Sequence, residues 1–87
     1  MLTRKELNEI AKEIVKENMD ALKNHLDKER KNAFDFSEKS MQSWKAGFIQ
    51  ITEEYLKRHG IDLSTFEKED LYLLVAMQSM IATGGDN

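Results

Sequence analysis

The chain has 87 residues, of which 40% are hydrophobic and 33% are charged, and it carries a formal net charge of −3 with no cysteine. This composition is typical of a globular protein rather than a disordered one, and the length predicts a single domain over residues 1–87. The lack of cysteine excludes a disulfide and a thiolate zinc site, and the mildly acidic balance argues against a generic DNA-binding domain.

The sequence predicts neither a secretory signal nor a membrane span. Charged side chains interrupt the first 15 residues, and the longest uncharged segment, residues 71–85, is 15 residues long. A helix that crosses a bilayer needs about 20 predominantly apolar residues. We therefore expect a cytoplasmic protein without membrane contact.

The N-terminal third of the chain predicts one long helix. Thr3 and Glu6 have the spacing of a capping box, which makes Arg4 the first helical residue. Apolar residues then recur at intervals of three and four: Leu7, Ile10, Ala11, Ile14, Val15, Met19, Leu22 and Leu26. Because neither glycine nor proline interrupts this pattern, we expect a helix over about residues 4–32, roughly 43 Å long. So long a helix must overhang its neighbours, bend, or be covered by another subunit.

A second helix is predicted over about residues 38–59. Its apolar stripe consists of Met41, Trp44, Phe48, Ile51 and Tyr55. Cationic residues fill its last turn, where they suit the helix dipole, and Gly60 fits the left-handed position that follows a helix end. Ile61 can then pack back on Leu56, as a Schellman motif requires.

A third helix is predicted over about residues 65–83. Ser64 and Glu67 have capping-box spacing. From Leu71 to Ala82 all but two residues are apolar, which is typical of a helix that is buried on most sides. The three helices indicate an all-α fold, either a three-helix bundle or an open helical array with a long N-terminal helix.

The third predicted helix has more apolar surface than two neighbouring helices can cover. We expect one line of its side chains, Leu71, Val75 and Ala82, to face outward. Because a monomer rarely exposes such a patch, these residues predict the interface of a homo-oligomer, most simply a two-fold dimer. In the alternative interpretation the long first helix covers both faces, and the protein is a monomer.

Two polar residues, Asn18 and His25, interrupt the apolar face of the first predicted helix. With Glu29 one turn beyond His25, they could form part of a metal site or a base with its orienting group. However, no second cluster of histidine and acidic residues completes a set of three or four ligands, so neither a metal nor another cofactor is predicted. We interpret Asn18, His25 and Glu29 as a polar seam that fixes helix register and oligomeric state.

Basic side chains concentrate near the end of the first predicted helix, at Lys23, Lys28, Arg30 and Lys31. They could bind a small anionic ligand such as a nucleotide at an oligomer interface, or, as a weaker alternative, a nucleic acid. Acidic residues are interleaved with them, so a solvated face with ion pairs at helical spacing explains the same pattern.

The sequence contains no phosphate-binding glycine loop and no hydrolase or metalloprotease motif, so no catalytic residues and no enzymatic activity are predicted. Residues 61–87 carry five acidic side chains and one lysine. Glu67, Glu69 and Asp70 among them could bind a basic groove of another protein. The leading hypothesis is a small protein–protein interaction module, such as a bacterial or phage regulator or inhibitor that acts by occlusion. The alternatives are an oligomeric binder of an anionic ligand and an accessory protein that binds nucleic acid.

Overall fold

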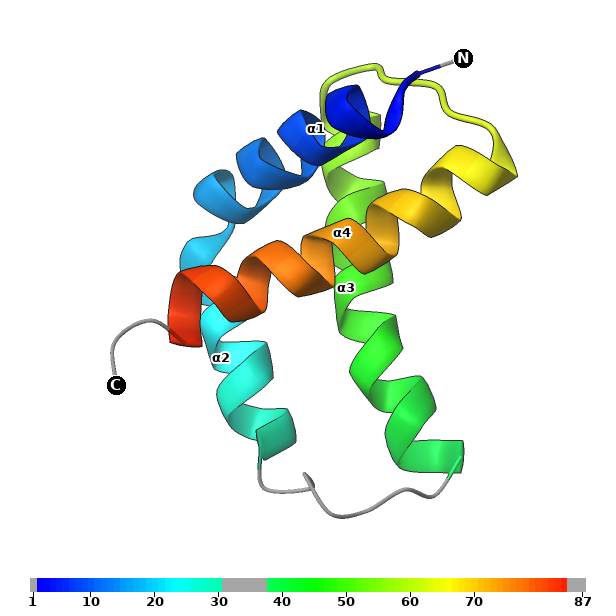
Figure 1. Cartoon of the computed structure of the whole chain (residues 1–87). Helices are drawn as coiled ribbons and strands as arrows, with labels where there is room; N and C mark the ends of the chain where they lie inside the picture. Colours follow the sequence, from blue (N-terminus) through cyan, green and yellow to red (C-terminus); the bar gives the residue numbers. More distant parts are fainter. Residues whose placement is uncertain (1, 31–37, 85–87) are drawn as a thin grey trace.

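The computed structural model describes residues 2–30 and 38–84, without the side chains of residues 29, 30, 38–44 and 84. Within these ranges the chain forms no strand and four α-helices: α1 (Arg4–Glu17), α2 (Met19–Arg30), α3 (Glu38–Arg58) and α4 (Thr65–Gly84) (Figure 1). The predicted all-α fold is confirmed. The predicted second and third helices agree with α3 and α4 to within one residue at each end.

Helices α1 and α4 lie side by side and run in the same direction, and α4 passes across α3 (Figure 1). Hydrogen bonds fix this pairing near its start, where the Leu2 N–H donates to a Glu67 carboxylate oxygen at 2.9 Å. Further along, Gln78 Nε2 donates to Asn8 Oδ1 at 3.1 Å. The core between the helices contains Leu7, Ala11, Ile14, Val15, Leu22, Phe48, Tyr55, Leu56, Leu63, Leu71, Leu74, Val75 and Ala76.

The predicted continuous first helix is wrong, because the chain bends at Asn18 and forms α1 and α2 instead. Asn18 leaves the helical conformation, with φ −119° and ψ 26°. Its backbone N–H and its side-chain Nδ2 both donate to the Ile14 carbonyl oxygen, at 3.0 and 2.9 Å. Asparagine competes with a helix in this way because its short side chain reaches the nearby backbone. Asn18 therefore caps α1 and does not continue a polar seam along one helix.

The end of α1 is attached to the end of α3. The Glu17 carboxylate lies 2.7 Å from Arg58 Nη2 and 3.2 Å from His59 Nε2. The Tyr55 and His59 rings are 4.2 Å apart between centroids. Burial raises the pKa of the Tyr55 hydroxyl, and the nearby negative charge of Glu17 adds to this effect. These contacts hold the bend against α3.

The Schellman motif predicted at the end of α3 is confirmed. Gly60 has φ 63°, which only glycine adopts without strain. The Ile61 N–H donates to the Leu56 carbonyl at 2.9 Å, and the Gly60 N–H donates to the Lys57 carbonyl at 3.3 Å. Leu56 is buried and Ile61 packs against the core, so the turn after α3 is attached to the core on both sides of Gly60.

The inner and outer faces of α4 are the reverse of the prediction. Leu71 and Val75, predicted to face outward in an oligomer interface, are 0% exposed within the chain's own core. Ala11 on α1 and Ser79 on α4 are also 0% exposed. Leu71 and Val75 belong to the same buried cluster as Leu7, Ala11 and Ile14 of α1. Of the three predicted interface residues, Ala82 is exposed.

His25 lies half-buried between α2 and α3. Its ring meets the Phe48 ring edge-on, with centroids 5.1 Å apart and an interplanar angle of 87°. A Cβ atom at Gly47 would lie 2.3 to 2.6 Å from atoms of the imidazole. Glycine at position 47 therefore allows the imidazole to lie against the backbone of α3, and His25 has a packing role at the α2–α3 contact.

The contact between Gly47 and His25 predicts that the effect of Gly47→Ala on stability depends on whether the His25 side chain is present. Alanine gains about 1 kcal/mol of helix propensity, but displacing the imidazole costs about 1–3 kcal/mol. We expect Gly47→Ala to leave the free energy of unfolding unchanged or to lower it by up to about 2 kcal/mol. In a His25→Ala background the same change should raise it by about 1 kcal/mol, measured by urea denaturation. An equal gain in both backgrounds would contradict the contact.

Candidate functional site

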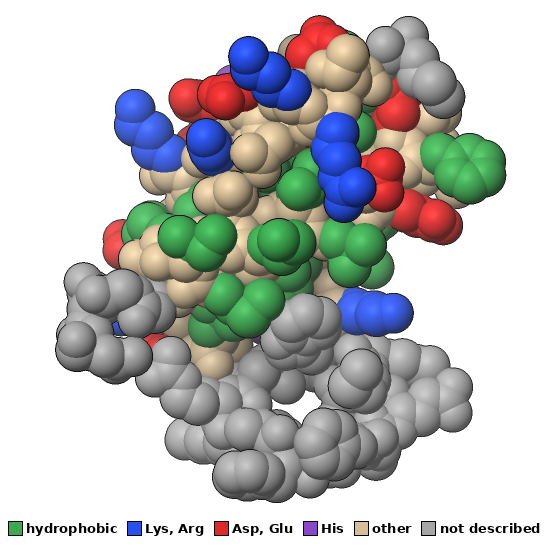
Figure 2. All heavy atoms as spheres, viewed as in Figure 1, with side chains coloured by type: hydrophobic (Ala, Val, Ile, Leu, Met, Phe, Trp, Pro, Cys, Tyr) green, Lys and Arg blue, Asp and Glu red, His purple; other side chains and the backbone are tan. Residues whose placement is uncertain are grey.

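The side of α4 that faces away from the core carries large apolar side chains. Five of them are exposed by about half or more: Phe66 (78%), Leu73 (57%), Met77 (52%), Met80 (45%) and Ile81 (65%). We call these five residues the outer stripe. Figure 2 shows hydrophobic side chains gathered along α4 on this face of the molecule. Soluble monomers rarely expose so contiguous an apolar patch, and such patches mark interaction surfaces.

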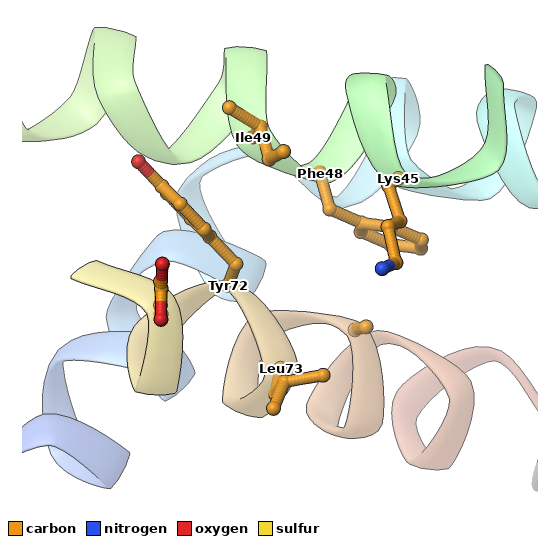
Figure 3. Close-up of a pocket in the computed structure, with 7 residues that line it drawn as sticks. Lys45, Phe48, Ile49, Tyr72 and Leu73 are labelled. Atoms are coloured by element: carbon orange, nitrogen blue, oxygen red, sulfur yellow. The ribbon is translucent and has the colours of Figure 1, made fainter. Parts of the chain in front are cut away.

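A groove between α3 and α4 adjoins the outer stripe. It has a volume of about 480 Å³ and is lined by Lys45, Phe48, Ile49, Glu69, Tyr72, Leu73 and Ala76. Figure 3 shows Phe48 and Lys45 extending from α3 toward α4, and Tyr72 extending from α4 toward α3. Leu73 belongs to both the groove and the outer stripe, so the two form one continuous surface.

Glu53 on α3 fixes one wall of the groove by binding two residues of α4. The Tyr72 hydroxyl donates to Glu53 Oε1, and Lys68 Nζ lies 3.7 Å from Glu53 Oε2. Burial raises the pKa of Tyr72 to about 12, and the hydrogen bond to Glu53 acts in the same direction. The neutral phenol donates this hydrogen bond, which links α4 to α3.

The three acidic residues predicted to bind a partner have different roles in the structure. The Glu67 carboxylate accepts hydrogen bonds from the backbone N–H groups of Ser64 (3.0 Å) and Leu2 (2.9 Å). The Glu67 N–H in turn donates to Ser64 Oγ at 3.3 Å, which confirms the predicted capping box. Glu67 is thus a helix cap that also anchors the N-terminus. Glu69 and Asp70 are exposed beside the outer stripe.

The structure describes only some of the residues of the predicted basic site and of the predicted polar seam. Lys23 and Lys28 are exposed on α2, and within the described residues neither lines the groove between α3 and α4. The side chains of Arg30 and Glu29, and the whole of Lys31, lie outside the described residues. The bend at Asn18 separates this residue from His25, which lies on α2, and their predicted influence on oligomeric state stays a prediction.

Among the residues that the structure describes, no three histidine or acidic side chains are placed to hold a metal ion. Over the same residues, no helix combines the length and hydrophobicity that a bilayer-spanning segment needs. The chain matches no protein-family model, no curated protein and no solved structure. The candidate site is therefore assigned from the geometry of the outer stripe and the groove.

Sequence reasoning assigned the outer stripe to the wrong side of its helix, because charged residues precede both apolar lines of α4. Asp70 lies four residues after Phe66 and three before Leu73, so it occupies the same line along the helix. A charged side chain in that line indicates that the line faces solvent, because an unpaired charge is rarely buried. The same rule applies to the line through Leu71, because Glu67 and Lys68 lie four and three residues before it, so charge alone does not decide between the two lines.

Glu67 predicts a specific acid dependence of stability. Hydrogen bonds from the Leu2 and Ser64 backbone lower the pKa of Glu67 below its usual value of 4.5. A carboxylate with a lowered folded-state pKa stabilises the fold above the unfolded-state pKa, and this contribution is lost as the pH falls through the folded-state value. We expect the wild type to lose more stability than Glu67→Gln between about pH 5 and pH 3, measured by thermal unfolding.

The matched control is Glu69→Gln, which removes an exposed carboxylate from the same helix. This variant should retain the acid dependence of the wild type, because Glu69 forms none of the capping hydrogen bonds. Equal acid dependence in the wild type and Glu67→Gln would show that the Glu67 carboxylate does not contribute as described.

Proposed function

We propose that this protein is a non-enzymatic protein–protein interaction module that binds its partner through the outer stripe and the adjoining groove. The observation that supports this proposal is the pair of apolar faces on α4. One face fills the core with Leu71 and Val75, and the opposite face exposes five large apolar side chains. Removing one such side chain from water is worth about 1.5–3 kcal/mol, although association entropy offsets much of the total.

The composition of this surface suits binding rather than chemistry. Phe66 is an aromatic side chain of the kind that is enriched at interface centres. Met77 and Met80 are flexible and polarizable, so they adapt to a complementary surface. Charged residues, including Glu69 and Lys45, border the apolar centre. An apolar centre with a polar rim is the usual anatomy of a protein interface.

A surface of this kind acts by covering another surface. An 87-residue protein that occupies a partner's binding site can block or organise it without catalytic groups of its own. The proposal therefore includes the behaviour of a small regulator or inhibitor that works by occlusion. It assigns no role in binding to Leu71 and Val75, because both are enclosed in the core.

Site-specific photo-crosslinking tests whether the outer stripe is the contact surface. A photoreactive amino acid is placed in the full chain at Leu73 or Met77, and at Asn24 on α2 as the control. All three positions are exposed. After irradiation in the native host, we expect one defined protein adduct from positions 73 and 77 and none from position 24. Adducts of equal yield from all three positions would contradict the proposal.

A charged double variant tests the same surface energetically. Leu73→Asp combined with Met77→Asp places two carboxylates in the outer stripe and should weaken binding of the crosslinked protein by at least about tenfold, because buried apolar anchors dominate interface energies. The control, Ala21→Asp with Asn24→Asp, adds the same charge at exposed positions of α2. Both double variants should unfold at the temperature of the wild type. Undiminished binding by the α4 variant would refute the assignment of the surface.

A further inference from the structure

Four residues of the outer stripe, together with Asp70, have the spacing of a coiled-coil seam. Phe66, Asp70, Leu73, Met77 and Met80 follow one another at intervals of four, three, four and three residues. All five side chains are exposed. The mean interval of 3.5 residues is that of a helix face which packs along a second helix. The shape of this surface therefore selects a helix as its ligand.

The seam carries a negative charge near its N-terminal end, between Phe66 and Leu73, and is apolar along the rest. Asp70 lies within it, and Glu69 is exposed beside it. Lys68 is the one cation that residues 61–87 contain, and its Nζ already lies 3.7 Å from Glu53. Apolar side chains occupy the seam from Leu73 to Met80. A complementary helix must therefore supply a positive charge at one position and apolar side chains at the others.

The α4 helix of a second copy does not supply that positive charge in a symmetric pair. In a parallel pair of α4 helices, Asp70 meets the Asp70 of the other copy, and like charges repel. In an antiparallel pair centred on the segment from Phe66 to Ile81, Asp70 meets the second copy's Met77. Both arrangements enclose a carboxylate without a cation, which is strongly unfavourable. Charge complementarity thus favours a different chain.

Building on the proposed function, we infer that the outer stripe binds one amphipathic helix of another protein. That helix carries apolar residues at heptad spacing opposite Leu73, Met77 and Met80, and a lysine or arginine opposite Asp70 and Glu69. It runs antiparallel to α4, because its basic residue then lies toward its C-terminus, where a cation suits the helix dipole. One of its apolar side chains enters the groove between Leu73 and Ile49.

A displayed library of amphipathic helices tests this inference. The library has three heptads with fixed apolar seam positions, except that the seam position facing Asp70, the second from the C-terminal end, and its flanking positions are randomised. Library members that bind are selected separately on the wild-type chain, on Asp70→Lys and on the control Asp20→Lys. The control makes the same charge change at an exposed position of α2. Affinities of the selected helices are then measured as synthetic peptides, beside matched peptides in which the basic residue is glutamate.

We expect the wild type and Asp20→Lys to enrich lysine and arginine at the randomised seam position. They should bind the basic peptide about five- to tenfold more tightly than its glutamate counterpart. Asp70→Lys should enrich acidic residues at that position and reverse the preference. Equal affinity of the basic and glutamate peptides for the wild type overturns the inference, as does selection of no helix.

Light scattering on the same samples separates this inference from the proposed function. If the chain selects no helix but forms a dimer that Leu73→Asp dissociates, a second copy occupies the outer stripe. This result overturns the inference and supports the proposed interaction surface. If neither helix binding nor self-association depends on Leu73, the inference and the proposed function both fail.

Discussion

The packing of α1 against α4 determines which side of α4 remains exposed. The Leu2–Glu67 and Asn8–Gln78 hydrogen bonds set the position of one helix along the other. Ser79 is 0% exposed and donates its hydroxyl to the Val75 carbonyl at 2.7 Å, so this buried hydroxyl has a hydrogen-bond partner. Because Leu71 and Val75 lie in the core, helical geometry turns Leu73 and Met77 to the opposite side.

The bend at Asn18 provides the second constraint on the site. A straight helix would carry the chain past the end of α4, whereas the bend turns α2 toward α3 (Figure 1). Glu17 attaches the bend to Arg58, and His25 packs against Gly47 at the other contact with α3. Together with the Glu53–Tyr72 hydrogen bond, these contacts hold α3 beside α4 and keep the groove in place. The candidate binding surface is thus a consequence of how three other helices are fastened to α4.

The features that the sequence predicts correctly are those that a few neighbouring residues decide. The capping boxes at Thr3 and Ser64 and the Schellman motif at Gly60 each depend on side chains within one or two turns. A bend was one of three expectations for the long first helix, but its position was not predicted, because the apolar spacing continues across Asn18 and no glycine or proline marks it. The role of His25 was missed because it depends on Gly47, which lies on another helix.

Two lines of apolar residues along α4 have similar hydrophobicity, and the sequence does not decide which of them faces the core. Packing against α1 decides that choice, and this packing involves residues more than 60 positions away. Charged residues do not decide it either, because Asp70 precedes Leu73 in one line and Glu67 precedes Leu71 in the other. Taken one residue at a time, an exposed apolar surface has the same composition as a buried face. Only the arrangement of the helices distinguishes a binding surface from a buried face.

The central claim is that the two apolar sides of α4 have different roles, and the free energy of unfolding of two leucine variants tests it most directly. Leu71→Ala should lose about 2–5 kcal/mol, because Leu71 is 0% exposed and its removal leaves a cavity. Leu73→Ala should change the free energy of unfolding by less than about 0.5 kcal/mol, because Leu73 is 57% exposed. A loss for Leu73→Ala that equals or exceeds the loss for Leu71→Ala would show that the stripe is part of the core and would contradict the account.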